Sequence, residues 1–270
     1  MISDVYLDST VLIAVITFLF GTMVGSFLNV CIARIPNGQS VVRPPSHCPK
    51  CKKSIPFYDN IPILSYLVLR GRCRSCGERI SPRYLFVEVL MGSLAAALYY
   101  QFGLGLAFFV AFIFVAALIV ISFIDMDALI IPNEISLPGI VLGFLVSLAG
   151  QFVIADPSEL IPTPLNSIVG ILAGYGFLWT VAWIYERCTG IEGMGGGDMK
   201  LLAMFGAFLG WQSIPFTIFF GSLAGSVVGL GVMLATGASR RLRVPFGPFL
   251  CLGATLHLFF GRELVAFYFN

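Results

Sequence analysis

The sequence predicts an all-α, polytopic integral membrane protein with about eight membrane-spanning helices and a metal-stapled polar loop. Three observations support this prediction. The chain has 270 residues, of which 58% are hydrophobic and 11% are charged, and its mean hydropathy is +0.93. Apolar runs recur at close to the roughly 20 residues that a helix needs to cross a bilayer. The basic residues are concentrated in a few polar segments between these runs. A water-soluble domain of this composition would lack the polar groups to cover its surface, so that class is excluded.

The first apolar run extends from about Thr10 to Ile32. Asp4 and Asp8 precede it, and the first basic residue, Arg34, follows it. This order of charges predicts a first span whose amino end lies outside, and not a cleaved signal peptide. Further spans are expected over residues 84–100, 104–124, 135–152, 165–185, 198–211, 215–235 and 248–264.

A polar segment from Arg34 to Arg83 separates the first two spans and contains ten of the sixteen basic residues. By the positive-inside rule this loop is cytoplasmic. With eight spans both termini then lie outside. The loop with Asp156, Pro157 and Pro162–Pro164 also lies outside, and Arg240, Arg241 and Arg243 mark another cytoplasmic loop.

Glycines recur at four-residue spacing within several predicted spans, a pattern typical of closely packed helices. We predict packing faces, and no chemical role, for Gly21/Gly25, Gly170/Gly174, Gly206/Gly210 and Gly221/Gly225/Gly229.

The polar loop contains two Cys-x-x-Cys pairs, Cys48/Cys51 and Cys73/Cys76. This pattern is typical of a tetrahedral zinc site with four thiolate ligands. Such a closed site leaves no position for water, so its role would be structural, and metal binding would supply folding free energy to a loop with little core. Unligated thiols are the main alternative, because disulfides are rare in a reducing cytoplasm.

Acidic residues stand at the ends of two predicted spans. Asp198 follows the glycine-rich run 193–197, and Asp125 and Asp127 end an earlier apolar run. Carboxylates at such positions are costly and by default indicate function, and two of them could share a proton and activate water. The alternative is that Asp198 caps the next helix and that the other two are solvated loop residues. Asp125 and Asp127 lie about 200° apart around a helix, so they cannot both face one partner, and residue spacing alone does not choose between them.

Several motifs resemble one known family. Gly195-Gly196-Gly197-Asp198 matches the Gly-x-Gly-Asp motif of intramembrane aspartyl proteases, and the run from Gly193 to Gly210 is similar to bacterial type IV prepilin peptidases. Asp125 stands seven residues before Pro132, the spacing at which that family carries its other catalytic aspartate. Three segments of this chain also resemble the family's N-terminal region: Gly25–Val30, the four-cysteine loop and Arg70–Glu88.

The resemblance implies catalytic roles for Asp125 and Asp198, with Gly195 and Gly197 supporting the motif. It implies cleavage of the basic leader of type IV prepilins, or of type II secretion pseudopilins, at the cytoplasmic face of the bacterial inner membrane. It also implies methylation of the new amino terminus with S-adenosylmethionine, for which no binding residue can be named. Residues 1–83 would form the first span and the methyltransferase-associated zinc loop, and residues 84–270 the peptidase domain. A bilayer and a pilin are the expected partners, and no nucleic acid is expected.

Two rival functions remain at this stage. A transporter or channel also uses intramembrane carboxylates, but would place them through the spans, whereas Asp125, Asp127 and Asp198 all stand at predicted cytoplasmic ends. A non-catalytic pilus or secretion assembly factor would use the zinc loop to bind a partner.

Overall fold

The computed structural model describes residues 2–152, 160–190, 195–236 and 244–269, with side chains omitted for 2–9, 152, 262 and 264–269. Asp156, Pro157, Gly193, Met194, Arg240, Arg241 and Arg243, on which some of the predictions above depend, lie outside these described residues.

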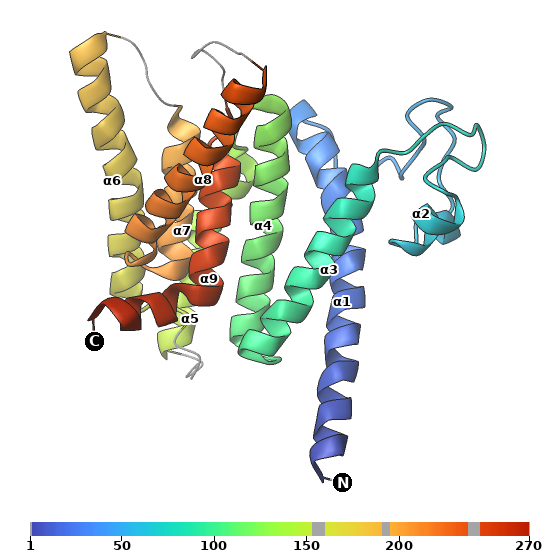
Figure 1. The fold of residues 1–270 in the computed structure, drawn as a ribbon, viewed down its shortest axis with the longest axis horizontal. Coiled ribbons are helices and arrows are strands. Elements are labelled where there is room, and N and C mark those ends of the chain that lie inside the picture. The colour runs from blue at the N-terminus through green and yellow to red at the C-terminus, as the bar shows by residue number, and fades with distance from the viewer. Residues whose placement is uncertain (1, 153–159, 191–194, 237–243, 270) are drawn as a thin grey trace. The chain divides into compact units, whose positions relative to one another are not determined.

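The described part of the chain is helical and contains no extended strand, which confirms the predicted fold class (Figure 1). The elements are α1 (Ile2–Arg34), η1 (Ile35–Asn37), η2 (Phe57–Asp59), α2 (Leu64–Val68), α3 (Pro82–Phe102), α4 (Leu106–Ala128), α5 (Asn133–Phe152), α6 (Pro164–Thr189), α7 (Gly196–Leu209), α8 (Ser213–Thr236) and α9 (Gly247–Phe269).

Six segments are long and apolar enough to cross a membrane: Thr10–Asn37, Pro82–Phe102, Leu106–Ala128, Asn133–Gln151, Pro164–Thr189 and Ser213–Thr236. The two other predicted spans coincide with α7, which has 14 residues, and with α9, whose fully described apolar part is Gly247–Gly261. At 1.5 Å per residue α7 is about 21 Å long, shorter than the roughly 30 Å hydrocarbon core. The chain is therefore a polytopic membrane protein, and the count of eight spans stays a prediction.

The chain divides into two compact units, residues 1–120 and residues 121–270. In the first unit α1 packs along α3. A Cβ placed on Gly21 would lie 2.7 Å from the Cβ of Ala95, and one on Gly25 would lie 2.8 Å from the Cα of Glu88. The absence of side chains at these two glycines lets the helices approach closely, as their spacing predicted.

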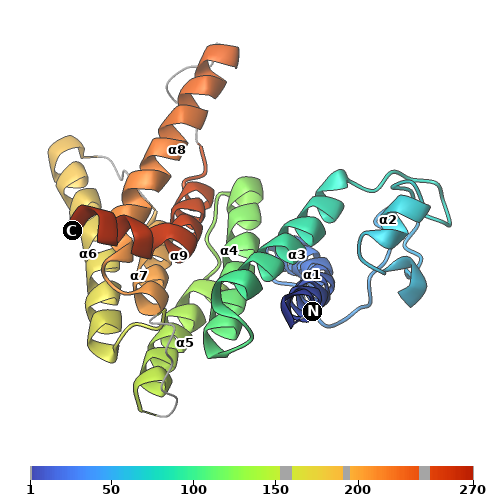
Figure 2. The same cartoon turned by 60° about the horizontal axis from the view of Figure 1, so that its bottom comes forward.

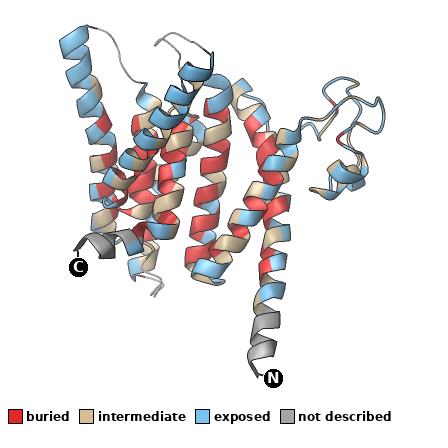
Figure 3. Ribbon diagram, in the orientation of Figure 1, coloured by how far each residue is buried: buried red, intermediate tan, exposed pale blue. Residues whose placement is uncertain are grey.

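In the second unit α7 is the central helix. It contacts α5, α6, α8 and α9 (Figure 2), and every residue from Leu201 to Phe208 is buried (Figure 3). Gly170 of α6 meets the backbone of Gly206, and Gly174 meets that of Leu202, so α6 and α7 are in backbone contact. Gly221 packs on Phe249, whereas a Cβ on Gly229 would have no neighbour within 4 Å, so the predicted packing role was wrong there. Gly210 is the C-cap of α7, with φ 78°, and not part of a helix face.

Candidate active site and candidate metal centre

Asp125 lies near the carboxyl end of α4, within the second unit. Its side chain is buried, with 6% exposure, and its Oδ2 accepts a hydrogen bond of 2.9 Å from the backbone N–H of Gly247. Gly247 is the first residue of α9, where helix N–H groups have no intrahelical partner and favour an acceptor or an anion. Asp125 is therefore not a solvated loop residue.

Gly247 is a site residue that the sequence analysis missed. A Cβ at this position would lie 2.7 Å from Oδ2 of Asp125, so only glycine lets the amide approach the carboxylate so closely. The one signal was a glycine before Pro248, a pair typical of the start of a helix. That pair identifies a helix start, but it does not identify a carboxylate 122 residues away.

Asp198 is half-buried in the first turn of α7. Gly195 occupies the N-cap position with φ −73° and ψ 145°, so the alternative that Asp198 caps this helix is wrong. A Cβ on Gly197 would lie 3.0 Å from the Cβ of Ile131, whereas Gly195 and Gly196 face open space. Gly197 therefore allows α7 to start against the segment that joins α4 to α5.

The structure brings Asp125 and Asp198 close enough for their charges to interact. Cys251 of α9 lies within range of both aspartates and shares a hydrogen bond with Ser122 of α4. Cys251 is buried and has a polar partner beside the carboxylate pair. The pair thus lies where α4, α7 and α9 meet within one unit.

Asp127 and Lys200 lie close to the pair in sequence but are placed differently. Asp127 is exposed whereas Asp125 is buried, as expected for residues two apart on a helix. The Lys200 ammonium donates a 2.8 Å hydrogen bond to Oδ1 of Asn133, the first residue of α5. Lys200 therefore links α7 to α5.

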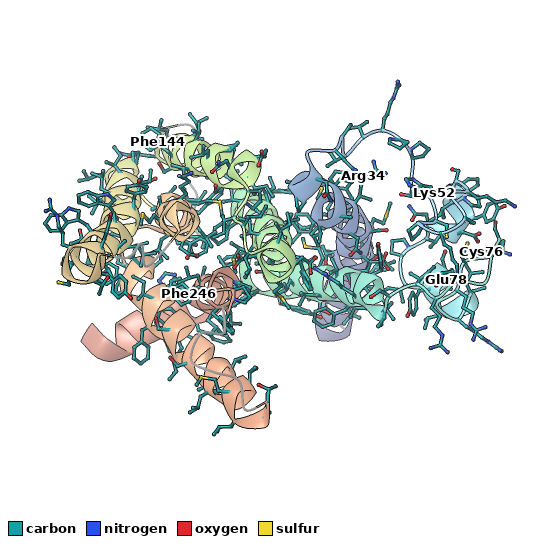
Figure 4. All side chains as sticks on the ribbon, turned by 90° about the horizontal axis from the view of Figure 1, so that it is seen from above. Arg34, Lys52, Cys76, Glu78, Phe144 and Phe246 are labelled. Carbon is teal, nitrogen blue, oxygen red and sulfur yellow. The ribbon has the colours of Figure 1, made fainter. Side chains whose placement is uncertain are left out.

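The four cysteines of the polar loop converge at one point, near the labelled Cys76 in Figure 4. The sulfurs of Cys48, Cys51, Cys73 and Cys76 all lie within 4.8 Å of one another, and the Sγ atoms of Cys48 and Cys76 are 3.8 Å apart. A tetrahedral ion with metal–sulfur bonds of about 2.3 Å separates its ligands by about 3.8 Å. The four sulfurs therefore fit a metal ion.

The two cysteine pairs have the same backbone geometry. In each pair the residue one before the first cysteine bridges the residue six after it: His47 with Ser54 and Arg72 with Arg79. The residue four after the first cysteine has positive φ in both, 58° at Lys52 and 71° at Gly77. Two equivalent turns facing each other present four sulfurs to a common centre.

Backbone hydrogen bonds favour a thiolate at Cys48, whereas burial and hydrogen bonds with the neighbouring sulfurs raise the pKa of Cys76 to about 11. Hydrogen bonds from the backbone N–H groups of Cys51 and Lys50 lower the pKa of Cys48 to about 6. The Lys50 ammonium is paired with the Glu78 carboxylate, and this partner, followed by the nearby Cys76 and Cys48, raises the pKa of Lys50. A cation beside the sulfurs would partly neutralise a four-thiolate site, so these residues fit a thiophilic metal.

Fold and site together define a class: a polytopic membrane protein that places two aspartates from different helices within electrostatic range of each other. The comparison with known families is specific. Residues 19–102 match the Bacterial Peptidase A24 N-terminal domain, and residues 112–230 match the type IV leader peptidase family. The chain belongs to the type IV leader peptidase family.

Curated relatives match over almost the whole chain. The prepilin leader peptidase/N-methyltransferase of Aeromonas hydrophila is 36% identical over 94% of this chain and 92% of its own length. The protein of that name from Pseudomonas putida is 36% identical over 91% of this chain and 90% of its own length. The one from Burkholderia pseudomallei (strain K96243) is 37% identical over 89% of this chain and 83% of its own length. No solved structure matches the chain.

Proposed function

We propose that this protein cleaves the leader from type IV prepilins or pseudopilins and then N-methylates the new amino terminus. The peptidase proposal depends on the electrostatic proximity of Asp125, near the carboxyl end of α4, and Asp198, in the first turn of α7, in a chain of this family. The methyltransferase proposal depends on the relatives' names and on the matching N-terminal domain.

In the proposed mechanism Asp125 is the base, because the Gly247 amide that donates to it stabilises a carboxylate anion. Asp125 takes a proton from water as the oxygen attacks the scissile carbonyl carbon. Protonated Asp198 donates its proton to the carbonyl oxygen and so stabilises the tetrahedral intermediate. The intermediate collapses when Asp125 returns its proton to the leaving amine and the oxygen returns the other to Asp198.

We propose Zn²⁺ as the metal of the four-cysteine site, with a structural role, because four thiolates leave no open position. S-adenosylmethionine would supply the methyl group, and the chain's part would be to hold the neutral amine in line with it and to exclude water. Residues 1–83 are proposed to serve methylation and residues 84–270 peptide cleavage.

The proposed location is the bacterial inner membrane, with both termini outside and the carboxylate pair at the cytoplasmic face. This orientation places the polar loop, which carries ten of the sixteen basic residues, on the cytoplasmic side.

The deciding experiment is cleavage of a prepilin peptide by the purified protein, with Asp198→Asn as the matched variant. We expect cleavage by the wild type and none by the variant, at equal amounts of folded protein. An inactive wild type would favour the assembly-factor function, and ion flux through vesicles that Asp198→Asn abolishes would favour the transporter.

A further inference from the structure

The polar loop carries an exposed apolar face to which neither proposed reaction assigns a role. It is formed by η2 and α2, which contact each other and are joined by the Ser65 hydroxyl, which donates to the carbonyl of Tyr58. We call this surface the loop apolar face, and it consists of Phe57, Ile61, Leu64, Leu67 and Val68. Phe57 is 86% exposed, Leu67 60% and Val68 67%.

Three of these side chains form one stripe. Leu64, Leu67 and Val68 follow the helical spacing i, i+3 and i+4 within α2, so they project from the same side of the helix, and Ile61 lies three residues before it. Contiguous apolar patches of this kind on a polar segment mark interaction surfaces. Their exposure is similar to that of apolar residues on the spanning segment of α1, such as Leu12 at 60% and Met23 at 64%.

The charge around the face indicates which partner fits. Residues 34–83 contain ten basic residues and two acidic ones, Asp59 and Glu78, a net charge of +8, which a Zn²⁺ ion with four thiolates would reduce to +6. Both acidic side chains are engaged in ion pairs, Asp59 with Arg74 and Glu78 with Lys50. A surface with this excess of positive charge repels a basic partner and attracts an anionic one.

A buried contact sets the level of the face along the spanning helices. Glu88 of α3 is buried, and its Oε2 accepts a 2.8 Å hydrogen bond from the backbone N–H of Ile63, the N-cap of α2. The same carboxylate bonds the side chain of Ser26 in α1. Ile63 has φ 62°, which is unfavourable for a β-branched residue, so the contact holds a strained backbone in place.

Glu88 is six residues after Pro82, where α3 begins, which corresponds to about 9 Å along the helix axis. The start of α2 is therefore held beside the second turn of a spanning helix, and not beyond its end. Interfacial helices bury their apolar faces about 5–10 Å into the boundary between headgroups and acyl chains. With the first turn of α3 at the level of the lipid headgroups, α2 would lie at this boundary.

We propose that the loop apolar face lies in the membrane interface, in contact with anionic phospholipid. Phe57 and the aliphatic stripe enter the boundary region, and the surrounding Lys and Arg side chains bind lipid phosphates. Glu88 is the positioning residue that holds α2 at this depth. The proposal goes beyond the two reactions and depends on neither of them.

The test is photolabelling of the full-length protein in nanodiscs. The bilayers are phosphatidylcholine alone or phosphatidylcholine with phosphatidylserine, each with a trace lipid that carries a diazirine next to its headgroup. Trypsin cleavage after Lys53 and Arg70 would release residues 54–70 as one peptide that holds the whole face. We expect lipid adducts on this peptide, severalfold more with phosphatidylserine, and few on residues 75–79. Equal labelling in both bilayers would overturn the anionic part of the proposal.

Matched variants test the residues. Leu67→Glu should reduce labelling of its peptide severalfold, whereas Ser54→Glu, an equal added charge in the same peptide, should leave it unchanged. Glu88→Leu, which cannot accept from Ile63, should reduce labelling more than Glu88→Gln, which can. Bound metal shows in each case that the loop is folded. Absence of adducts on residues 54–70, with metal retained and α1 labelled, would overturn the proposal and indicate that the face meets protein or solvent.

Discussion

The bond between the Gly247 amide and Asp125 is the most specific residue-level feature of the candidate active site. It joins two residues 122 positions apart at 2.9 Å, within buried surroundings. It also distinguishes Asp125 from Asp127, which is exposed. Burial and an amide partner support Asp125 over Asp127 as the second catalytic aspartate. The family's spacing to Pro132 also favours Asp125, whereas helical periodicity alone did not distinguish the two.

Replacing Gly247 with Ala should strongly reduce prepilin cleavage. The added Cβ would meet Oδ2 of Asp125 at 2.7 Å, so the carboxylate must move, and a displacement near 1 Å can cost about 10²-fold in rate. The measurement is kcat on a prepilin peptide. Gly196→Ala is the control, since Gly196 has open space around it. Equal activity of the two variants would show that Asp125 does not need the amide.

Substituting the three aspartates one at a time should show how much each contributes to prepilin cleavage. Asp125→Asn and Asp198→Asn should abolish cleavage while the protein still inserts and accumulates, because each removes one member of a proton-sharing pair. Asp127→Asn should retain more activity than Asp125→Asn, since Asp127 is exposed. The opposite order would refute the assignment. The pH–rate profile should report the pair and not either residue alone.

At the scale of elements, the loop is built from two equivalent cysteine turns and two short helical segments with little buried core. The sulfurs of both turns meet within 4.8 Å, so neither turn can complete the site alone. Metal binding is therefore expected to be the main source of the loop's folding free energy.

Purified protein should carry about one zinc per chain, and Cys73→Ser/Cys76→Ser should remove it. The loop should then become sensitive to protease, because its two halves lose their common ligand. Elemental analysis and limited proteolysis measure the two effects. Cys188→Ser is the control, since Cys188 lies in α6, outside the cluster. Full zinc occupancy in the double variant would disprove the site.

The ion pair between Arg74 and Asp59 should make loop stability depend on pH. Two bonds, Nη2 to Oδ1 at 2.6 Å and Nε to Oδ2 at 2.8 Å, join the second cysteine turn to η2. These hydrogen bonds from Arg74 lower the pKa of Asp59. A lowered folded-state pKa gives stability that is complete above the unfolded pKa and is lost as the pH falls through the folded value.

Asp59→Asn should therefore increase protease sensitivity at neutral pH, and its difference from the wild type should vanish in acid. Comparing the two proteins at each pH removes the effect of zinc loss, which both share. A difference that persists below the folded pKa of Asp59 would show that the charge of Asp59 is not the cause. Arg79→Lys is a useful reference, because it keeps the loop charge and leaves the pair intact.

At the scale of the whole molecule, the sequence predicts the helix positions well, because hydrophobic length and charge distribution are local properties. Ser81 before Pro82 and Thr163 before Pro164 also cap α3 and α6, as local signals predict. The fit of the four cysteines to a metal followed from their spacing. The Gly247–Asp125 and Glu88–Ile63 hydrogen bonds could not be predicted from the sequence, because each depends on tertiary packing between distant segments.

The two proposed activities should be separable, because the cysteine cluster and the carboxylate pair lie in different units. Asp198→Ala should still transfer a labelled methyl group from S-adenosylmethionine to a pre-cleaved pilin peptide. Cys48→Ser should reduce methyl transfer more than it reduces prepilin cleavage. If the wild-type protein cleaves prepilin but transfers no label, the protein is a peptidase without methyltransferase activity.

The hydrogen bond from Gly247 has a consequence for biosynthesis. The ribosome makes Asp125 and Asp198 well before the segment that begins at Gly247, so a growing chain has both acids but not the amide donor to Asp125. We therefore expect the hydrolytic site to be completed only when α9 has been made and inserted. Synthesis and insertion would thus keep the protease inactive until the segment that begins at Gly247 is in place.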